Sequence, residues 1–180
     1  MRKIILDLAV SLDGMIEGPN GEYDWCIMEP DMNFDKFLAE TDAVFYGRKS
    51  YELFGSQQPE TFGSDLEREV YESVSRKKKY VFSRTLTAAG DATIVSGNIE
   101  EEVKKIKAMP GKNIWLFGGA SLVTDFVNAG LVDEYRLSVH PIVLGSGKPL
   151  FQDIRQRVKL KLVRSETFSS GVIQLYYQPE

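Results

Sequence analysis

Two adjacent glycines, Gly118 and Gly119, separate an apolar strand-like run from an amphipathic helical pattern. Because glycine has no side chain, a ligand can approach its backbone closely and the chain can turn sharply there. The first amides of the following helix, from Ala120 and Ser121 onward, offer unpaired N–H groups at the positive end of the helix dipole. The pattern favours a phosphate site. It is equally compatible with a tight strand-to-helix connection that binds nothing.

Cations and hydroxyls follow two other short apolar runs in the same way. The first group is Gly47, Arg48, Lys49 and Ser50, and the second is Ser83 and Arg84. If both runs are neighbouring parallel strands, these side chains project from one edge of the sheet, where guanidinium and hydroxyl donors suit a phosphate. The alternative is that the cations are solvated loop charges. Two matching strand ends beside a glycine cradle favour phosphate binding.

Alternating strand-like and helical patterns indicate the architecture that positions these loops. Strands are expected at 3–10, 43–46, 79–82, 92–95 and 114–117, and helical spacing falls at 34–38, 65–75, 103–109 and 122–129. This order predicts an α/β fold with a largely parallel sheet and helices on both faces. Further strands at 135–144, 158–168 and 172–178, the last two joined by a Ser-Ser-Gly turn, predict antiparallel pairing at the C-terminal end. A single domain over residues 1–180 is expected.

The composition of the chain excludes several classes of partner and of functional site. The net charge is −4, which disfavours nucleic acid or an anionic membrane as a partner. One cysteine and one histidine exclude an intrachain disulfide and histidine-cluster zinc sites, so we expect no metal and a structural role for His140. Asp7 interrupts the first apolar run, which therefore resembles a strand more than a signal peptide, and no apolar stretch is long enough to span a membrane. A cytoplasmic protein is expected.

The ordered set of motifs resembles dihydrofolate reductase. The Gly-Arg loop after one strand, the Ser-Arg pair after the next and the late Phe-Gly-Gly-Ala segment occur in the order of that family. The segments 11–14, 130–134 and 141–147 are similar to the reductase domain of bacterial riboflavin biosynthesis, which shares the fold. The resemblance covers nearly the whole chain. It implies a dihydrofolate reductase-like mixed sheet, mostly parallel with antiparallel C-terminal strands.

The same resemblance implies an NADPH-dependent reductase. Pyrophosphate contacts are implied for Gly118, Gly119, Ala120 and Ser121, and contacts around the phosphates and the adenosine 2′-phosphate for Gly47, Arg48, Lys49, Ser50, Ser83 and Arg84. Ala9 matches the small residue whose backbone meets the nicotinamide carboxamide. The segment 12–25 corresponds to a mobile flap over the nicotinamide, and its glycine and proline content independently indicates a turn-rich loop.

A catalytic carboxylate is implied at Asp31. It precedes Gly47 at a spacing similar to that of bacterial dihydrofolate reductases, whose tryptophan is matched by Trp25. Asp31 also fits the N-cap of a helix over 32–40. The alternative carboxylates are Glu29, Asp35 and Asp13. A half-buried aspartate beneath a bound ring would have the raised pKa that acid catalysis near neutrality requires.

The expected reaction is hydride transfer from NADPH to a C=N or C=O carbon of a small heterocycle. The resemblance implies a pterin-like or ribosylamino-pyrimidine-like substrate, in contact with Trp25, Phe34 and Tyr51. The zinc ligands of the deaminase domain that accompanies the riboflavin reductase are absent from the sequence. The alternative function is nucleotide binding by the same fold without reductase activity.

Apolar residues on the C-terminal strands exceed what one sheet face needs. They are Val139, Val143, Leu160, Leu162, Val172 and Leu175. Exposed apolar surface of this kind usually marks a partner surface. We therefore expect a homodimer that forms through these strands.

Overall fold

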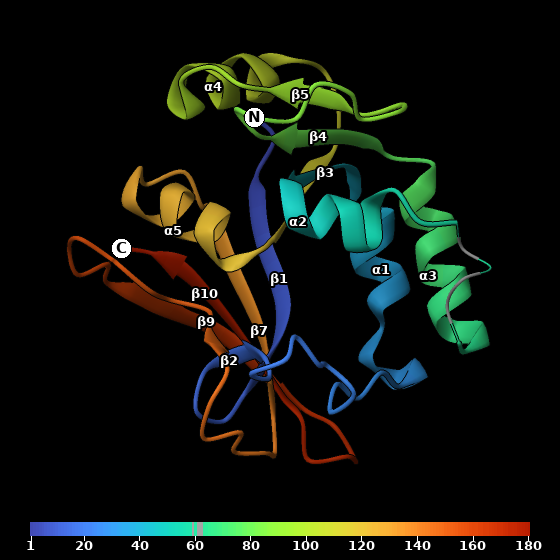
Figure 1. The fold of residues 1–180 in the computed structure, drawn as a ribbon. Coiled ribbons are helices and arrows are strands. Elements are labelled where there is room, and N and C mark those ends of the chain that lie inside the picture. Colours follow the sequence, from blue (N-terminus) through green and yellow to red (C-terminus); the bar gives the residue numbers. More distant parts are fainter. Residues whose placement is uncertain (59, 61–62) are drawn as a thin grey trace.

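The computed structural model describes residues 1–58, 60 and 63–180, and it is built on an eight-stranded sheet (Figure 1). In spatial order the strands are β5 (Thr93–Val95), β4 (Lys78–Phe82), β3 (Thr41–Gly47), β6 (Asn113–Gly118), β1 (Ile4–Ser11), β7 (Glu134–His140), β10 (Ile173–Pro179) and β9 (Leu160–Thr167). The strands from β5 to β7 are parallel, and β10 is antiparallel to both β7 and β9. The predicted mixed sheet is confirmed.

The strands lie close to their predicted positions because their sequence signals are local. In β3, the residues from Ala43 to Tyr46 are completely buried, as expected for a parallel strand covered on both faces. β7 ends at His140, earlier than predicted, and Pro141 follows without an N–H group to continue the ladder. The two-stranded ribbon of β2 (Met15–Glu17) and β8 (Lys148–Pro149) was not predicted, because such short segments carry no readable periodicity.

Helices cover both faces of the sheet, as the strand–helix alternation predicted (Figure 1). One face packs against α4 (Ile99–Ala108) and α5 (Ala120–Asn128), and the other against α1 (Phe34–Ala39), α3 (Asp65–Ser75) and the run of α2 (Arg48–Ser50) with the π-helical turn Tyr51–Gly55. Ile106 and Phe126 are buried in the first core, and Phe37 and Val74 in the second. The two cores hold the sheet edge that carries the phosphate-binding motifs.

The sheet separates along the second half of β1. Pairing between β1 and β6 ends at Leu6 and Leu116, whereas pairing between β1 and β7 continues to Ser11 and His140. Beyond Leu6, β1 therefore has a strand neighbour on one side only. Ligands in open α/β sheets bind in crevices of this kind, outside the carboxyl ends of the strands.

β9 forms an exposed edge of the sheet. Leu162 and Val163 on this strand are 50% and 54% exposed, and Val143 in the loop after β7 is 65% exposed. Val172 is completely buried within the chain itself, so it cannot contribute to a partner surface. The homodimer remains a prediction. Within residues 1–58, 60 and 63–180, no helix has the length and apolar character needed to cross a membrane.

Candidate active site

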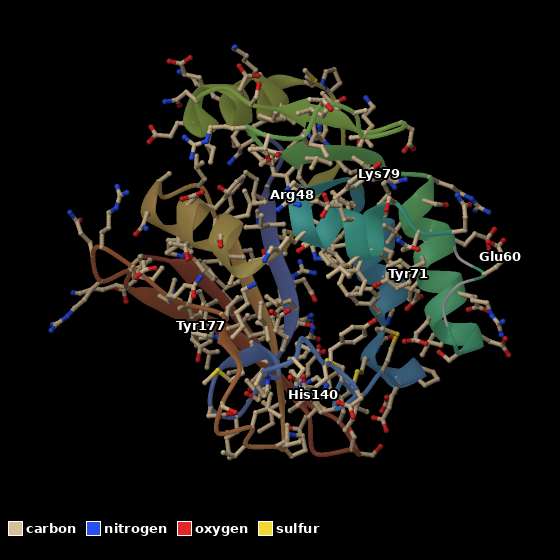
Figure 2. The ribbon with its side chains drawn as sticks, in the orientation of Figure 1. Arg48, Glu60, Tyr71, Lys79, His140 and Tyr177 are labelled. Carbon is tan, nitrogen blue, oxygen red and sulfur yellow. The ribbon has the colours of Figure 1, made fainter. Side chains whose placement is uncertain are left out.

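A cavity of about 1310 Å³ opens where β1 and β6 separate. One end is lined by the loops that follow β3, β4, β5 and β6, and the other by β1, β7, β10 and the flap segment 12–25. Arg48 and His140 both line this cavity, and Figure 2 shows them well apart, with Arg48 in the upper part of the view and His140 in the lower part. The cavity is larger than the roughly 300–1,000 Å³ that drug-sized pockets occupy.

The first end contains the predicted phosphate-binding residues. Those that line the cavity are Gly47, Arg48, Lys49, Ser50, Ser83, Arg84, Gly119, Ala120 and Ser121. The two glycine loops are in contact, since a Cβ added to Gly47 would lie 3.7 Å from the Gly119 amide nitrogen and one added to Gly119 would lie 3.2 Å from the Ser50 hydroxyl. The tertiary fold therefore brings the loop 47–50 into contact with the loop 118–121. We call these two loops together the cradle.

The cradle ends at the N-terminus of α5. Gly119 is the N-cap residue, and no side chain caps the helix there, so its first N–H groups are available to an anion. Gly118 is buried and has a φ of +109°, which side-chain-bearing residues rarely adopt. The Gly118–Gly119 peptide bond is cis. The φ of Gly118 therefore favours glycine at that position, and a Cβ at Gly119 would lie only 3.2 Å from the Ser50 hydroxyl oxygen.

Two arginines, Arg48 and Arg84, lie beside the cradle. The Arg48 guanidinium donates to Glu52 at 2.9 Å, and the two side chains are 42% and 46% exposed. An exposed pair of this kind contributes at most about 1 kcal/mol, so Arg48 can turn to a phosphate at little cost. Ser83 accepts hydrogen bonds from the amides of Thr85 and Leu86, which fixes the turn that carries the exposed Arg84.

One further cation was missed by sequence reasoning. Arg155 lines the same end of the cavity, and its amide donates to Asn128 Oδ1 on α5 at 2.9 Å. Arg155 follows β8 in a loop without a recognisable motif. Only the packing of this loop against α5 brings it to the site.

The second end of the cavity is a polar strip on one face of the sheet. Asp7 and Ala9 on β1 share this face with Ser138 on β7 and Gln174 on β10, as the strand registers show. Ala9 was predicted from the family resemblance to be near the nicotinamide, and it lines the cavity. Aromatic rings of Phe34, Trp115 and Phe117 form an adjoining wall, with Phe34 and Trp115 at 5.5 Å between ring centroids. Phe34 therefore lines the cavity, and its contact with a substrate stays a prediction.

Asp7 is the buried carboxyl group of this strip, and sequence reasoning did not propose it for the site. It is 4% exposed, and its Oδ2 atom has no hydrogen-bond partner among the described residues. Burial is the main cause that raises the pKa of Asp7 to about 7, with Glu40 and Glu134 adding to the increase and Arg136 opposing it. A carboxyl group with this pKa lies in the cavity that also holds the cradle, and perturbed groups in clefts are typical of functional sites.

Asp31 and two of the aromatic residues lie elsewhere. Asp31 is exposed in the 3₁₀ turn Pro30–Met32 and is not among the residues that line the cavity. It does not cap α1, because that helix begins at Phe34 after Asn33, which has a φ of 52°. Tyr51 is 6% exposed in the core, where its hydroxyl donates to the Ala89 carbonyl at 2.6 Å. Neither Glu29 nor Asp35 lines the cavity.

Trp25, the last residue of the flap segment, does not line the cavity either. Its ring meets His140 edge-to-face at 5.4 Å between centroids. His140 is 1% exposed, and its Nε2 accepts the Ile27 N–H at 2.9 Å while Nδ1 lies 2.9 Å from the Ser138 carbonyl. These contacts fit a neutral ring with the proton on Nδ1. His140 therefore fastens the segment after the flap to the sheet, which is the structural role that the sequence predicted.

Asp13 fastens the flap at its other end. Its carboxylate accepts from the Ser11 hydroxyl and from the amides of Leu144 and Gly145, at 2.7, 3.1 and 2.8 Å. These hydrogen bonds lower the pKa of Asp13 to about 2, the one from Ser11 most strongly. A carboxylate this acidic is unsuited to donate a proton near neutrality. Asp13 is thus a structural anchor of the flap.

The fold and cavity define a dihydrofolate reductase-like α/β protein with a glycine-lined cavity at the open edge of its sheet. The chain belongs to the RibD C-terminal domain family, which matches residues 2–174. It is 59% identical over 177 residues to YyaP of Bacillus subtilis strain 168, covering 98% of this chain and 94% of YyaP. It is 35% identical over 181 residues to YwjB of the same organism, covering 98% of this chain and 97% of YwjB. Both relatives are uncharacterized proteins.

Solved structures share the fold. A protein of Shewanella sp. PV-4 that is assigned to riboflavin biosynthesis matches with a TM-score of 0.81 and 24% identity, over 100% of this chain and 99% of its own. The Thermotoga maritima diaminohydroxyphosphoribosylaminopyrimidine deaminase/5-amino-6-(5-phosphoribosylamino)uracil reductase matches with a TM-score of 0.72 and 16% identity. That match covers 99% of this chain and 57% of the Thermotoga chain. The resemblance stated from the sequence is confirmed.

Proposed function

We propose that this chain is an NADPH-dependent reductase that transfers a hydride to a small heterocycle of pterin-like or ribosylamino-pyrimidine-like chemistry. One observation carries the proposal: a single cavity joins a glycine-lined, cation-flanked cradle to a buried polar strip on β1, β7 and β10. A nicotinamide dinucleotide carries phosphates and a redox-active ring at separate positions, which suits these two ends. Membership in the RibD C-terminal domain family supports the same reading.

The residues present fit this cofactor. In the proposal, Gly119 and the N-terminus of α5 hold the pyrophosphate, and Arg48 and Arg84 neutralise the adenosine 2′-phosphate. The backbone near Ala9 meets the nicotinamide carboxamide. This part of β1 has no β6 partner beyond Leu6, so its main chain is accessible from the cavity.

The bound nicotinamide supplies the hydride, and the protein supplies position and exclusion of water. Flap residues Ile16, Asn20 and Tyr23 line the cavity, and the flap is held by Asp13. The accompanying proton must come from a group that reaches the cavity. In the proposal, the buried Asp7 donates this proton and the exposed Asp31 does not. An Asp31→Asn variant with unchanged turnover would agree with that assignment.

The test is a pair of equilibrium titrations with NADPH and NADH on the wild-type protein, Arg48→Gln and Arg76→Gln. Arg76 is a matched control, because it pairs with Glu72 at the exposed end of α3 and does not line the cavity. A charge-assisted phosphate contact contributes about 1.5–3 kcal/mol, so wild-type protein should prefer NADPH by about 10- to 150-fold. The preference should collapse in Arg48→Gln and persist in Arg76→Gln.

Equal, weak binding of NADPH and NADH by the wild-type protein would refute the proposal. Where NADPH is preferred, its oxidation is followed at its near-ultraviolet absorbance with pterin and pyrimidine substrates. Tight binding without oxidation by any of them would favour the alternative, a nucleotide-binding protein that lacks reductase activity.

A further inference from the structure

Aromatic rings line the second end of the cavity in one connected series. The ring centroids of Trp115 and Phe117 on β6 are 4.9 Å apart, and Phe54 lies 5.4 Å from Phe117. Phe54 in turn meets Tyr23 of the flap at 5.4 Å and stacks on Tyr71 of α3 at 6.3 Å. The series therefore runs outward from the sheet to the flap and α3. We call the rings that line this part of the cavity the aromatic channel: Tyr23, Phe34, Phe54, Tyr71, Trp115 and Phe117.

Exposed aliphatic side chains continue the aromatic channel. Leu53, directly before Phe54, is 63% exposed, and Ile27 and Met28, which follow the flap, are 36% and 42% exposed. All three line the cavity. Apolar surface that is exposed within a groove is typical of a ligand site. The channel therefore presents surface that an apolar part of a ligand would cover.

Two carboxylates stand beside the outer rings of the aromatic channel. Glu67 lies one helical turn before Tyr71 on α3, and Asp24 follows Tyr23 in the flap; both carboxylates line the cavity. The capping box with Ser64 fixes the position of Glu67. Burial is the main cause that raises the pKa of Tyr71, and Tyr23 and Glu67 add to the increase. The outer end of the channel is thus apolar and negatively charged.

The cations that line the cavity belong to other elements. Within the described ranges 1–58, 60 and 63–180 they are Arg48, Lys49, Arg84, Lys148 and Arg155. The first three belong to the loops after β3 and β4, which the proposed function assigns to the phosphates of the cofactor. Lys148 pairs with Glu17 across the β2–β8 ribbon at 3.3 Å, and Arg155 stands beside α5. A phosphate in the aromatic channel would lose its water and meet two carboxylates, and both effects oppose binding.

We infer that the aromatic channel holds an uncharged apolar substituent of the substrate and excludes a phosphate ester. The inference rests on the proposed reductase function and narrows its substrate class to flat heterocycles without a phosphate. The Thermotoga maritima deaminase/5-amino-6-(5-phosphoribosylamino)uracil reductase has a phosphate-bearing substrate. This chain shares the fold of that protein but takes a different substituent on the ring.

The experiment compares riboflavin with its 5′-phosphate ester. The two probes share one flat heterocycle and one side chain, and they differ only in the phosphate. Each probe is titrated into the full-length protein saturated with NADP⁺, so that the cradle cations, Lys49 among them, already face the phosphates of the cofactor. Stacking of a flavin on tyrosine or tryptophan quenches its fluorescence, which reports binding in the aromatic channel.

Two variants test the charge of the channel. Leu53→Arg places a cation beside it, and the 63% exposure of Leu53 means that the substitution leaves the core intact. Val143→Arg is the matched control, because Val143 is 65% exposed and does not line the cavity. Calorimetric titration of every variant with NADP⁺ reports on the cradle. Failure of the substrate inference is therefore separable from failure of the reductase proposal.

The wild type and Val143→Arg should bind riboflavin at least about 10-fold more tightly than the phosphate ester. In Leu53→Arg the preference should disappear or reverse, because the new cation meets the phosphate. Tighter binding of the phosphate ester by the wild type would overturn the inference. Absence of riboflavin binding to protein that binds NADP⁺, or an unchanged preference in Leu53→Arg, would overturn it as well. Failure of the wild type to bind NADP⁺ would refute the reductase proposal and the inference with it.

Discussion

Replacing Asp7 with asparagine should stabilise the folded protein at neutral and alkaline pH. The pKa of Asp7 is raised by burial from 3.8 to about 7. Between these values the folded protein holds a proton that the unfolded chain has released. The contribution of Asp7 to stability is therefore fully present below the unfolded pKa and is lost as the pH rises through the folded pKa.

The size of the stability change follows from the shift in the pKa of Asp7. Each pKa unit corresponds to about 1.4 kcal/mol, so the full difference in unfolding free energy is on the order of 4 kcal/mol. Between about pH 5 and about pH 8.5, the wild type should lose roughly 3 kcal/mol relative to Asp7→Asn. For a chain of this length, that corresponds to about 6–12 °C in relative Tm.

The assay is urea denaturation followed by circular dichroism, at several pH values across that range, for the wild type, Asp7→Asn and Asp31→Asn. Asp31→Asn is the matched control, since it makes the same substitution at an exposed aspartate in the 3₁₀ turn Pro30–Met32 and removes no buried carboxyl group. The difference between Asp7→Asn and the wild type should grow with pH up to about 7 and then level off. Parallel profiles for these two proteins would refute the argument that Asp7 is neutral in the fold.

Three further predictions concern the flap and the assembly. Gly147→Ala should destabilise the protein by about 1–3 kcal/mol and separate β2 from β8. The alanine Cβ would lie 2.2 Å from the Glu17 carbonyl oxygen, and residue 147 has a φ of +143°. Gly145→Ala, which has open space around its Cβ, should cost less in the same thermal unfolding assay. His140→Phe should cost about 1–3 kcal/mol, since it leaves the Ile27 amide, in the segment after the flap, without its acceptor, and hydrogen exchange should accelerate in residues 23–28. The wild type should be a dimer by light scattering at micromolar concentration and Leu162→Glu a weaker one; a wild-type monomer would remove the dimer prediction.

Local patterns were sufficient to predict the eight strands of the main sheet, most of the helices and the two loops of the cradle. Strand and helix positions depend on periodicity and on stop signals within a few residues, and these signals are strong around Gly47 and Gly118. The parallel order then places both glycine loops at one edge of the sheet, and the structure brings them into contact. The site predictions failed for residues whose position depends on packing between distant parts of the chain. Tyr51 follows the arginine loop in sequence, yet it turns into the core, and Arg155 reaches the cavity from a loop with no motif.

The sequence by itself determined the family and the mixed sheet, and it predicted a phosphate-binding edge, because each depends on residue types at short spacing. In the sequence, Asp7 stands out only because it interrupts an apolar run. Its burial, its unsatisfied oxygen and the commitment of Arg136 to Glu134 and Glu40 exist only in the folded chain. A pKa depends on desolvation and on the partners that neighbouring charges choose. Only the tertiary structure could therefore decide which carboxyl group faces the cavity and in which protonation state.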